Sequence, residues 1–354
     1  MAYKFIFNPS TVRSRALILR EFGKPLRLGY IDVPEPGDDE AVLIRIVGAG
    51  MCKTDIRLWK GEEPREGFRT PFVLGHENAG VVEAVGKRVK GLNPGDKVLV
   101  YAIWADLNCK YCRIDKCMQC RGHAIPGQSY YYGGYAEYLY VPNYRYLVKI
   151  DIDPVEAAPL ADAGLTSYSA VKKALPYLRP DSSVIVYGVG GLASYAIQFL
   201  RHLAPYVKII AVSRSDNKLK WAVELGAHYA VHPSEVNKII KDLSPDGASV
   251  MLDFVGNEES AKMIPLLEPS GAVVLVGMEG KSYPIPVFET TVWQYVVIGS
   301  NYGSISEMEE MVKFVKEHGI KSYIEKVSLD ENAVNNALNK LAEGKVLGRF
   351  VITP

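Results

Sequence analysis

The sequence lacks the features that would place a protein in a membrane or outside the cell. The N-terminal stretch MAYKFIFNPSTVRSR contains no apolar run of signal-peptide length. The longest apolar runs, such as AVVLVGM, are far shorter than the roughly 18 residues needed to cross a bilayer. Cysteine is sparse, with five in 354 residues, whereas secreted disulfide scaffolds are short and cysteine-rich. We therefore expect a cytoplasmic protein with no membrane partner and no need of disulfides.

The chain also lacks an excess of charge of either sign. Its 41 basic and 40 acidic residues give a net charge of +1 and are spread along the sequence, whereas a nucleic-acid-binding protein usually shows a strongly basic patch. The tyrosine-rich run YYYGGYAEYLYVPNYRY lacks the interleaved positive charge that a stacking platform for single strands requires. Its alternation, glycines and prolines instead predict packed strands and turns. We expect no nucleic-acid partner.

The pattern of apolar residues changes near residue 160. Before it, short runs such as AVLIRIVGAG and DKVLVYAI are bounded by Gly, Pro or Asp, as strands are. After it, strand-like runs alternate with helical patterns, as in SSVIVYG followed by GLASYAIQFLRHL and then KIIAVS. This alternation predicts βαβ units and a parallel sheet. At about 100–200 residues per domain, the length favours two domains.

A glycine turn follows the first strand of the βαβ region. In VIVYGVGGLAS, the pattern G-x-G-x-x-A falls on Gly188, Gly190 and Ala193, with Gly191 inside it. Glycine permits the tight turn and the close approach of a pyrophosphate, and a small residue at 193 keeps the helix near the strand. The pattern alone is common, but its place at the start of a βαβ run predicts a dinucleotide site.

The tip of the second strand bears on the choice of nucleotide. An NAD-binding strand of this kind ends in Asp or Glu, which binds the ribose 2′-hydroxyl. Here KIIAVSRSDNK places Ser213 at the tip, followed by Arg214 and Ser215. A hydroxyl with an adjacent guanidinium binds a 2′-phosphate, which a carboxylate would repel. We expect NADP, with NAD as the alternative if Arg214 is only a solvated loop residue.

Four of the five cysteines lie in CKYCRIDKCMQC, residues 109–120. Clustered cysteines in a long, cysteine-poor chain favour a metal site over disulfides. A thioredoxin-like centre would need its CxxC beside a βαβ unit, and this run lies before the βαβ region. Two CxxC pairs can complete a closed tetrahedral zinc site. The residues of that cage would be Cys109, Cys112, Cys117 and Cys120.

A series of motifs runs along nearly the whole chain: GAGMCKTD, LGHENAG, the cysteine cluster, GGYAEY, EAAPLADAGLTSY, GVGGLAS and GRFVITP. Together they resemble the zinc-dependent medium-chain dehydrogenases, the superfamily of alcohol, polyol and sugar dehydrogenases. PLADAG, VGMEGK and SNYGS are more similar to the prokaryotic aldose 1-dehydrogenases that act on arabinose-like sugars. The resemblance implies an α/β protein with a GroES-like β-rich catalytic domain over 1–160 and 302–354, a zinc lobe at 106–120, and a Rossmann domain over 161–301.

The resemblance implies a catalytic zinc with an open fourth position. Its protein ligands would be Cys52, His76 and Asp162, and three ligands plus one open site are what catalytic zinc needs. Many members have cysteine where this chain has Asp162. A carboxylate keeps the charge of a thiolate but is a harder ligand, so the metal should be a stronger Lewis acid. Glu77, beside His76, is expected to compete as an oxygen ligand when the site is empty.

The resemblance also assigns residues to the proton path and to the nucleotide. Thr54 holds the position that accepts the proton of the substrate hydroxyl, and Asp55 would fix the tautomer of His76. Many alcohol dehydrogenases end this relay at a histidine where this chain has Arg57, so we expect the proton to leave through water or the ribose. The cofactor contacts implied by the family fall on Lys53, Thr166 and Arg349.

The resemblance offers a second cage for the structural zinc. The family spacing C-x2-C-x2-C-x7-C falls on Asp106, Cys109, Cys112 and Cys120, which leaves Cys117 spare. The alternative keeps the three cysteines and replaces Asp106 with Cys117. We favour the set with Asp106 because the family spacing is matched at every position.

These observations predict a zinc-dependent oxidoreductase that transfers hydride from an alcohol or sugar hydroxyl, with aldose C1 preferred, to NADP. The family forms dimers and tetramers, and the resemblance favours a homotetramer. An NAD-dependent dehydrogenase of primary or secondary alcohols is the first alternative. A nucleotide-binding structural protein on the same fold is the non-enzymatic alternative. Such proteins, like the related quinone and enone reductases, usually lack the zinc ligands that Cys52 and His76 would provide here.

Overall fold

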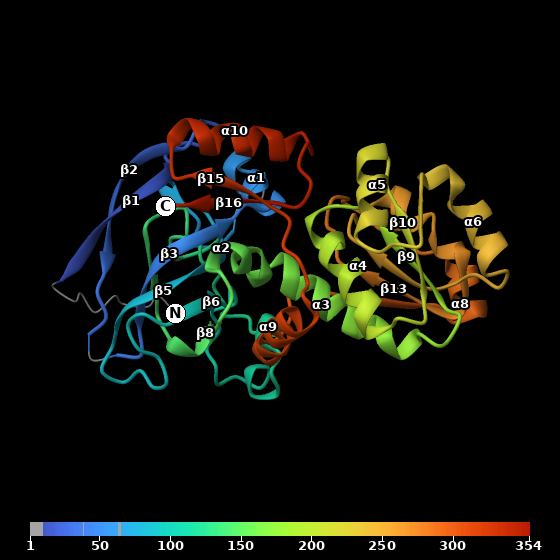
Figure 1. Ribbon diagram of the computed structural model, residues 1–354, viewed down its shortest axis with the longest axis horizontal. Helices are drawn as coiled ribbons and strands as arrows, with labels where there is room; N and C mark the ends of the chain where they lie inside the picture. The colour runs from blue at the N-terminus through green and yellow to red at the C-terminus, as the bar shows by residue number, and fades with distance from the viewer. Residues whose placement is uncertain (1–9, 38, 63–64) are drawn as a thin grey trace. The chain divides into compact units, whose positions relative to one another are not determined.

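The structure is a computed structural model that describes residues 10–37, 39–62 and 65–354. The chain forms two compact units (Figure 1). One unit contains the residues up to Asp162 together with Ile324–Pro354, and the other contains Ala163–Tyr323. No helix in the described part of the chain combines the length and the apolar character of a membrane span.

The second unit is built on a parallel sheet. Within the described residues, six strands run in the order β11-β10-β9-β12-β13-β14, and each adjacent pair is parallel. The predicted doubly wound α/β fold is therefore confirmed. The strands are β9 (Ser183–Tyr187), β10 (Lys208–Val212), β11 (Tyr229–Val231), β12 (Ala248–Asp253), β13 (Leu267–Leu275) and β14 (Val296–Gly299).

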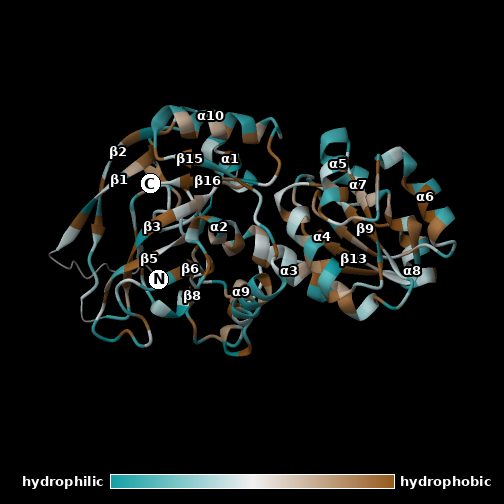
Figure 2. Ribbon diagram, in the orientation of Figure 1, coloured by the Kyte–Doolittle hydropathy of each residue, from teal (hydrophilic) through white to brown (hydrophobic). Residues whose placement is uncertain are grey.

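Helices cover this sheet because its central strands are rich in buried apolar residues. Ile185, Met251 and Val273 are fully buried, as expected for parallel strands that are covered on both faces. Figure 2 shows the resulting apolar centre around β9 and β13. The helices of this unit are α3 (Ala163–Ala174), α4 (Gly191–Leu203), α5 (Asp216–Glu224), α6 (Val236–Leu243), α7 (Glu258–Ala261), α8 (Val287–Trp293) and α9 (Ile305–His318).

The first unit is built mainly on antiparallel strands. Its larger sheet runs in the order β15-β16-β3-β5-β6-β8, with β7 also paired to β3, and its smaller sheet in the order β2-β1-β4. The larger sheet contains β3 (Val42–Gly50), β5 (Glu77–Val85), β6 (Lys97–Val100), β7 (Tyr138–Val141), β8 (Leu147–Lys149), β15 (Ile324–Ser328) and β16 (Arg349–Thr353). The smaller contains β1 (Thr11–Leu19), β2 (Arg27–Pro34) and β4 (Phe72–Val73).

Three helices accompany these strands: α1 (Lys53–Lys60), α2 (Pro154–Ala157) and α10 (Glu331–Ala342). The C-terminal segment belongs to this unit because β16 pairs with β3, with Val351 opposite Gly50. In Figure 1 this last strand lies beside β3, and α10 lies near α1. The strand formed by the motif GRFVITP thus pairs with the strand that ends in the motif GAGMCKTD.

The unit boundary after the parallel sheet differs from the expected one. The sequence placed the return to the first domain at residue 302, whereas residues 302–323 are grouped with the second unit. The physical reason is the packing of α9 on α3. The Tyr168 hydroxyl donates to Glu310 at 2.8 Å, and the Phe314 ring lies 5.7 Å from the Tyr168 ring, centroid to centroid.

Candidate active site

The N-terminus of α1 presents a thiol and a carboxylate together. Cys52 is the N-cap of this helix, and its backbone N–H donates to Asp55 Oδ2 at 2.8 Å. The Asp55 carboxylate therefore closes the first turn of the helix, where a negative charge is favoured. Both residues are buried, Asp55 completely. The motif MCKTD thus fixes a buried thiol beside a buried carboxylate.

His76 reaches the same place from the turn between β4 and β5. Gly75 before it has a φ of +105°, which favours glycine. The Nδ1 of His76 lies 3.1 Å from Asp55 Oδ1, and both side chains are completely buried. A carboxylate at this nitrogen holds the proton on Nδ1 and directs the lone pair of Nε2 toward a metal. The contact is the one expected if Asp55 fixes the tautomer of His76, and that role stays a prediction.

Asp162 completes the cluster from the end of the short 3-10 helix η4 (Ala158–Ala161). Its Oδ2 lies 3.4 Å from the Sγ of Cys52 and 3.4 Å from the Nε2 of His76. Ligand atoms of these three residues and of Glu77 all lie within 4.8 Å of one another, and all four residues are buried. The structure brings together the whole predicted catalytic set.

The buried carboxylate of Glu77 lies between Gly50 and Arg349. A Cβ at Gly50 would lie 2.1 Å from Glu77 Oε2, so only glycine at position 50 leaves room for the carboxylate. Burial raises the pKa of Glu77 to about 8, although Arg349 opposes the shift. The Nη2 of Arg349 lies 3.1 Å from Glu77 Oε1 and 3.8 Å from the Sγ of Cys52. The cofactor contact expected of Arg349 stays a prediction.

The chemistry of these donors fits a zinc ion. A thiol, an imidazole nitrogen and a carboxylate oxygen are the ligand types that zinc takes in proteins, and three of them leave one position open. The His76 imidazole is already oriented by Asp55. The ordinary reading of a buried cysteine as an apolar core residue does not account for two carboxylates and a histidine around Cys52. We therefore regard the cluster as the candidate catalytic metal centre.

The remaining predicted residues of MCKTD lie on α1 around this centre. The Thr54 hydroxyl oxygen lies 3.9 Å from the Sγ of Cys52, and Thr54 is buried. Lys53 is exposed, and Arg57 is half-buried. Thr54 therefore lies beside the candidate metal centre, and the roles expected of Thr54 and Lys53 stay predictions.

The glycine turn of the second unit has the form expected of a dinucleotide site. Gly188 follows β9 with a φ of +92°, and a Cβ there would lie 2.4 Å from Val255 Cγ2. Gly190 is the N-cap of α4, which has no side-chain cap. A Cβ at Gly190 would meet no atom within 4 Å. Because no protein atom fills this space, the backbone at the N-terminus of α4 fits a pyrophosphate. Gly191 begins α4, and Ala193 is buried.

The strand tip next to this turn carries hydroxyls and a cation. The N–H of Gly188 donates to the carbonyl of Val212, the last residue of β10, so the turn and the strand tip are neighbours. Ser213 is half-buried and accepts a hydrogen bond from the N–H of Ser215 at 3.3 Å, and Arg214 is exposed. No acidic residue occupies the strand tip. Elsewhere in this unit, Thr166 is buried in α3.

The cysteine lobe forms a second cluster in the first unit. Ligand atoms of one aspartate and three cysteines lie within 4.8 Å of one another. The Sγ atoms of Cys109 and Cys112 are 3.6 Å apart, and none of the chain's five cysteines forms a disulfide in the described structure. The cluster consists of Asp106, Cys109, Cys112 and Cys120.

Asp106 is oriented for this role by the backbone. Its Oδ1 accepts hydrogen bonds from the N–H groups of Asn108 and Cys109, both at 2.8 Å, and these bonds lower the pKa of Asp106. Cys117 is buried, and its thiol also approaches that of Cys112. The donor set with Asp106 fits a closed structural zinc site. The choice between Asp106 and Cys117 stays a prediction.

Comparisons with known proteins agree with the two folds and with the presence of metal-binding clusters. Residues 38–152 match the alcohol dehydrogenase GroES-like domain, and residues 191–317 match the zinc-binding dehydrogenase domain. The chain is 46% identical over 352 residues to the D-arabinose 1-dehydrogenase (NADP(+)) of Saccharolobus solfataricus, covering 98% of this chain and 99% of that protein. The chain belongs to the zinc-binding dehydrogenases of the alcohol dehydrogenase family.

A solved structure and a further relative are similar to this zinc-binding dehydrogenase over nearly its whole length. A crystal structure of the D-arabinose dehydrogenase from Sulfolobus solfataricus has a TM-score of 0.87 and 43% identity, and covers 97% of this chain and 100% of that one. An NAD-dependent alcohol dehydrogenase of Sulfolobus acidocaldarius is 35% identical, over 96% of this chain and 99% of that protein. The predicted family and the predicted two-domain fold are confirmed.

One residue of this dehydrogenase's site had no role in the sequence analysis. The hydroxyl of Tyr135, from the motif GGYAEY, donates to Asp55 Oδ2 at 2.9 Å, and Tyr135 is completely buried. No local pattern could reveal this contact, because 80 residues separate the two side chains. The motif itself was the only available signal.

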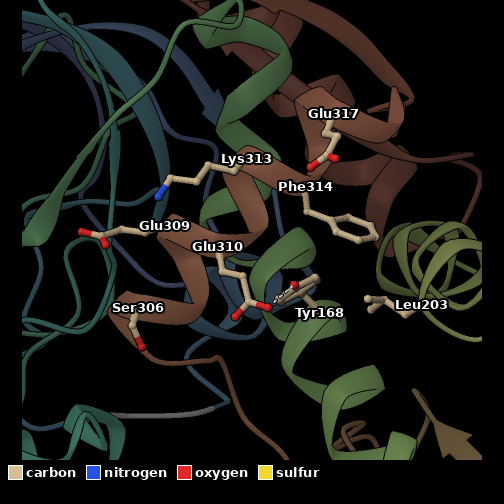
Figure 3. A pocket seen from close by; sticks show the side chains of 8 residues that line it. All are labelled: Tyr168, Leu203, Ser306, Glu309, Glu310, Lys313, Phe314 and Glu317. Atoms are coloured by element: carbon tan, nitrogen blue, oxygen red, sulfur yellow. Dashed lines mark hydrogen bonds between the residues drawn. The ribbon is translucent and has the colours of Figure 1, made fainter.

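A cavity of about 340 Å³ in the second unit is not the active site of this dehydrogenase. Figure 3 shows it between α3 and α9, with the bond from Tyr168 to Glu310 dashed. None of the residues that line it belongs to the predicted site. The lining residues are Tyr168, Leu203, Ser306, Glu309, Glu310, Lys313, Phe314 and Glu317.

Proposed function

We propose that this chain is a zinc- and NADP-dependent dehydrogenase that oxidises the C1 hydroxyl of pentose-like aldoses. The observation that carries the proposal is the buried cluster of Cys52, His76 and Asp162, which has the donors of a catalytic zinc. The choice of an aldose is supported by the 46% identity with a D-arabinose 1-dehydrogenase. The product of C1 oxidation would be the corresponding lactone.

The protein's first task is to hold and orient the metal. Cys52 and Asp162 supply negative charge, and His76 supplies a neutral nitrogen whose direction Asp55 sets through the 3.1 Å contact with Nδ1. When bound, zinc would supply the Lewis acidity that lowers the pKa of a substrate hydroxyl toward neutrality. A dication among these donors would balance the negative charge of Cys52 and Asp162. Glu77 is available there as a further oxygen donor.

The second task is to take the proton of the substrate hydroxyl. Thr54 is the residue of the described site best placed for this, because its Oγ1 lies 3.9 Å from the Sγ of Cys52. Its hydroxyl can accept a proton from the substrate and release its own. Arg57 cannot act as the terminal base, because a guanidinium stays protonated. The proton therefore leaves Thr54 through water or a cofactor hydroxyl.

The third task is to bind the nucleotide, whose nicotinamide accepts the hydride. The open space at Gly190 and the uncapped N-terminus of α4 would receive the pyrophosphate. Ser213 and Arg214 would bind the 2′-phosphate of NADP, with Ser215 beside them. This arrangement supports NADP, since NAD-specific sites place a carboxylate at the strand tip. The runner-up is an NAD-dependent alcohol dehydrogenase, the activity named for the relative in Sulfolobus acidocaldarius.

We further propose that the enzyme is a cytoplasmic homotetramer whose cysteine lobe holds a structural zinc. A reducing compartment favours this site, because oxidation of the three thiols to disulfides would remove the ligands. A subunit contact is supported by β14, the terminal strand of the described parallel sheet, and by the neighbouring helix α8. On that helix Val287 and Phe288 are 78% and 73% exposed, and exposed apolar side chains beside a strand edge favour contact with a second copy.

The proposal is tested by steady-state kinetics on metal-replete enzyme, with NADP and NAD in parallel. The panel contains D-arabinose, L-fucose, D-ribose, glucose, ethanol, 2-propanol and benzyl alcohol. We expect turnover of the pentoses and L-fucose with NADP, at a higher kcat/KM than with NAD. Turnover of simple alcohols with NAD would instead establish the runner-up. Absence of turnover with every substrate would favour a nucleotide-binding protein without this activity.

A further inference from the structure

We propose that Tyr135 is a positioning residue for the catalytic metal, acting on His76 through Asp55. The inference rests on the proposed catalytic zinc site and extends it to a residue outside the proposed set of metal ligands. The Tyr135 hydroxyl donates to Asp55 Oδ2 at 2.9 Å, and the other oxygen, Oδ1, lies 3.1 Å from His76 Nδ1. One carboxylate therefore links the tyrosine hydroxyl to the imidazole.

Among the described residues, three groups contact the Asp55 carboxylate, and of these Tyr135 alone comes from outside the two metal-binding segments. Its Oδ2 accepts from the N–H of Cys52 at 2.8 Å as well as from Tyr135. Both oxygens are thus engaged, and the carboxylate is completely buried. A buried carboxylate with a free lone pair is costly and can rotate to find a donor. The Tyr135 hydroxyl removes that freedom and fixes the plane in which Asp55 meets His76.

The backbone around Tyr135 is fitted to the turn that carries His76. The N–H of Tyr135 donates to the carbonyl of Leu74 at 3.0 Å, and the N–H of Gly134 donates to the carbonyl of Gly75 at 2.9 Å. A Cβ at Gly75 would lie 2.5 Å from Tyr135 Cδ1. The segments LGH and GGY are therefore in direct contact. The turn that contains His76 thus also fixes the position of Tyr135.

The chemistry of the hydroxyl suits a fixed donor. Burial, followed by the nearby Asp55 charge, raises the pKa of Tyr135 well above 10, so the phenol stays protonated and its hydrogen bond always points to the carboxylate. Any buried tyrosine hydroxyl needs a hydrogen-bond partner. What distinguishes Tyr135 is that its partner is the carboxylate that contacts His76. Outer-shell partners of this kind change metal affinity when they are removed, typically by about 10–100-fold.

The test uses Tyr135→Phe in the full-length enzyme, which keeps the ring and deletes the hydroxyl. We expect the dissociation constant for zinc at the catalytic site, measured by competition with a chelator, to rise about 10-fold. After exchange of that zinc for cobalt, with the lobe zinc retained, the visible absorption bands of the cobalt should shift. Asp55→Asn provides the background for a double-mutant cycle, in which Tyr135→Phe should add less than about twofold because its route to His76 is already lost.

Tyr140→Phe is the matched control. Tyr140 lies in β7, five positions further along the same segment, and its hydroxyl also donates to an aspartate, Asp39, at 3.4 Å. This control should leave the zinc affinity and the cobalt bands unchanged. If Tyr135→Phe fails to fold, 3-fluorotyrosine at position 135 keeps the ring and the hydroxyl while changing the donor strength, and the cobalt bands should still shift.

The outcomes separate this inference from the proposed function. Weaker zinc binding, shifted cobalt bands and loss of the effect in the Asp55→Asn background support it. An unchanged zinc affinity with unchanged bands, or an equal effect in both backgrounds, overturns it while leaving the catalytic zinc intact. Wild-type enzyme that binds only one zinc per chain, retained when Cys52 is replaced by serine, overturns the catalytic site and this inference together.

Discussion

The carboxylate of Asp162 lies 3.4 Å from the thiol of Cys52, although 110 residues separate them in the chain. Neither residue signals a metal site by itself, because a lone buried cysteine is usually an apolar core residue. Together with His76 they make a mixed set of sulfur, nitrogen and oxygen donors. With zinc bound, the oxygen donor would make the metal a stronger Lewis acid than a second sulfur would. We therefore expect position 162 to affect both the retention of the metal and its Lewis acidity.

Replacement of Asp162 should separate these two effects. Asp162→Asn removes the ligand charge, so we expect loss of one zinc per chain and a fall in kcat/KM larger than the roughly 10–100-fold that outer-shell changes cost. Asp162→Cys keeps the charge with a softer donor, so the zinc should be retained and kcat should fall by about 10-fold or less. Metal analysis and kinetics measure both. The exposed carboxylate of Glu156 on α2 gives a control, Glu156→Gln, that should change neither.

The composition of the structural zinc site can be decided by counting metal ions. Asp106 belongs to the four-residue cluster, so Asp106→Ala should lose one zinc per chain and lower the Tm by several degrees, because metal binding contributes to folding. Cys117→Ser should keep two zinc ions. The reverse pattern, with zinc lost from Cys117→Ser and kept by Asp106→Ala, would assign the site to the four cysteines.

The sequence could predict those parts of the molecule that depend on local order. The parallel sheet and the helix after Gly190 follow from apolar periodicity and from a turn that only small residues allow, and α4 has the predicted bounds, Gly191–Leu203. The metal centre could not be predicted in this way, because its ligands come from a helix N-terminus, a turn and the end of a 3-10 helix. Only the resemblance to a family brought Cys52, His76 and Asp162 together.

Two contacts of the site were predicted neither from local sequence patterns nor from the resemblance to a family. Arg349 was expected at the cofactor, and the structure shows in addition that it is buried with its guanidinium on Glu77. Tyr135 had no expected role, although its motif was recognised. Both contacts depend on how segments far apart in the chain meet, and this is decided by packing rather than by the pattern within either segment.

A pH effect on stability is expected from a histidine far from the predicted metal ligands in sequence. His202 is exposed overall, but partial desolvation, and then the neighbouring His318 and Arg201, lower its pKa below the usual 6.5. The His202 and His318 rings are 4.8 Å apart. A lowered pKa means that the folded state binds the proton more weakly than the unfolded state. The stabilising contribution is therefore complete above pH 6.5 and is lost as the pH falls below it.

His202→Gln should accordingly flatten the loss of stability on the acid side. We expect the difference in free energy of unfolding between variant and wild type to change between pH 7.5 and 5.0 by a fraction of a kcal/mol, because the ring is exposed and screened by solvent. Denaturant unfolding at the two pH values measures it. Loss of zinc at low pH would destabilise the variant and the wild type equally, so it cancels in the difference between their free energies of unfolding. A difference that is independent of pH would contradict the prediction.

The preference for NADP should depend on the tip of β10. In Ser213→Asp/Arg214→Ile the new carboxylate would bind the 2′-hydroxyl of NAD and repel a 2′-phosphate. Charge-assisted hydrogen bonds contribute about 1.5–3 kcal/mol, so the ratio of kcat/KM for NADP over NAD should fall by roughly 10–100-fold or more. Lys220→Gln removes a positive charge from an exposed position of the same helix, α5, and should leave the ratio unchanged. If the ratio does not move in the double variant, the 2′-phosphate is bound by other residues, and Ser213 and Arg214 have no part in the choice.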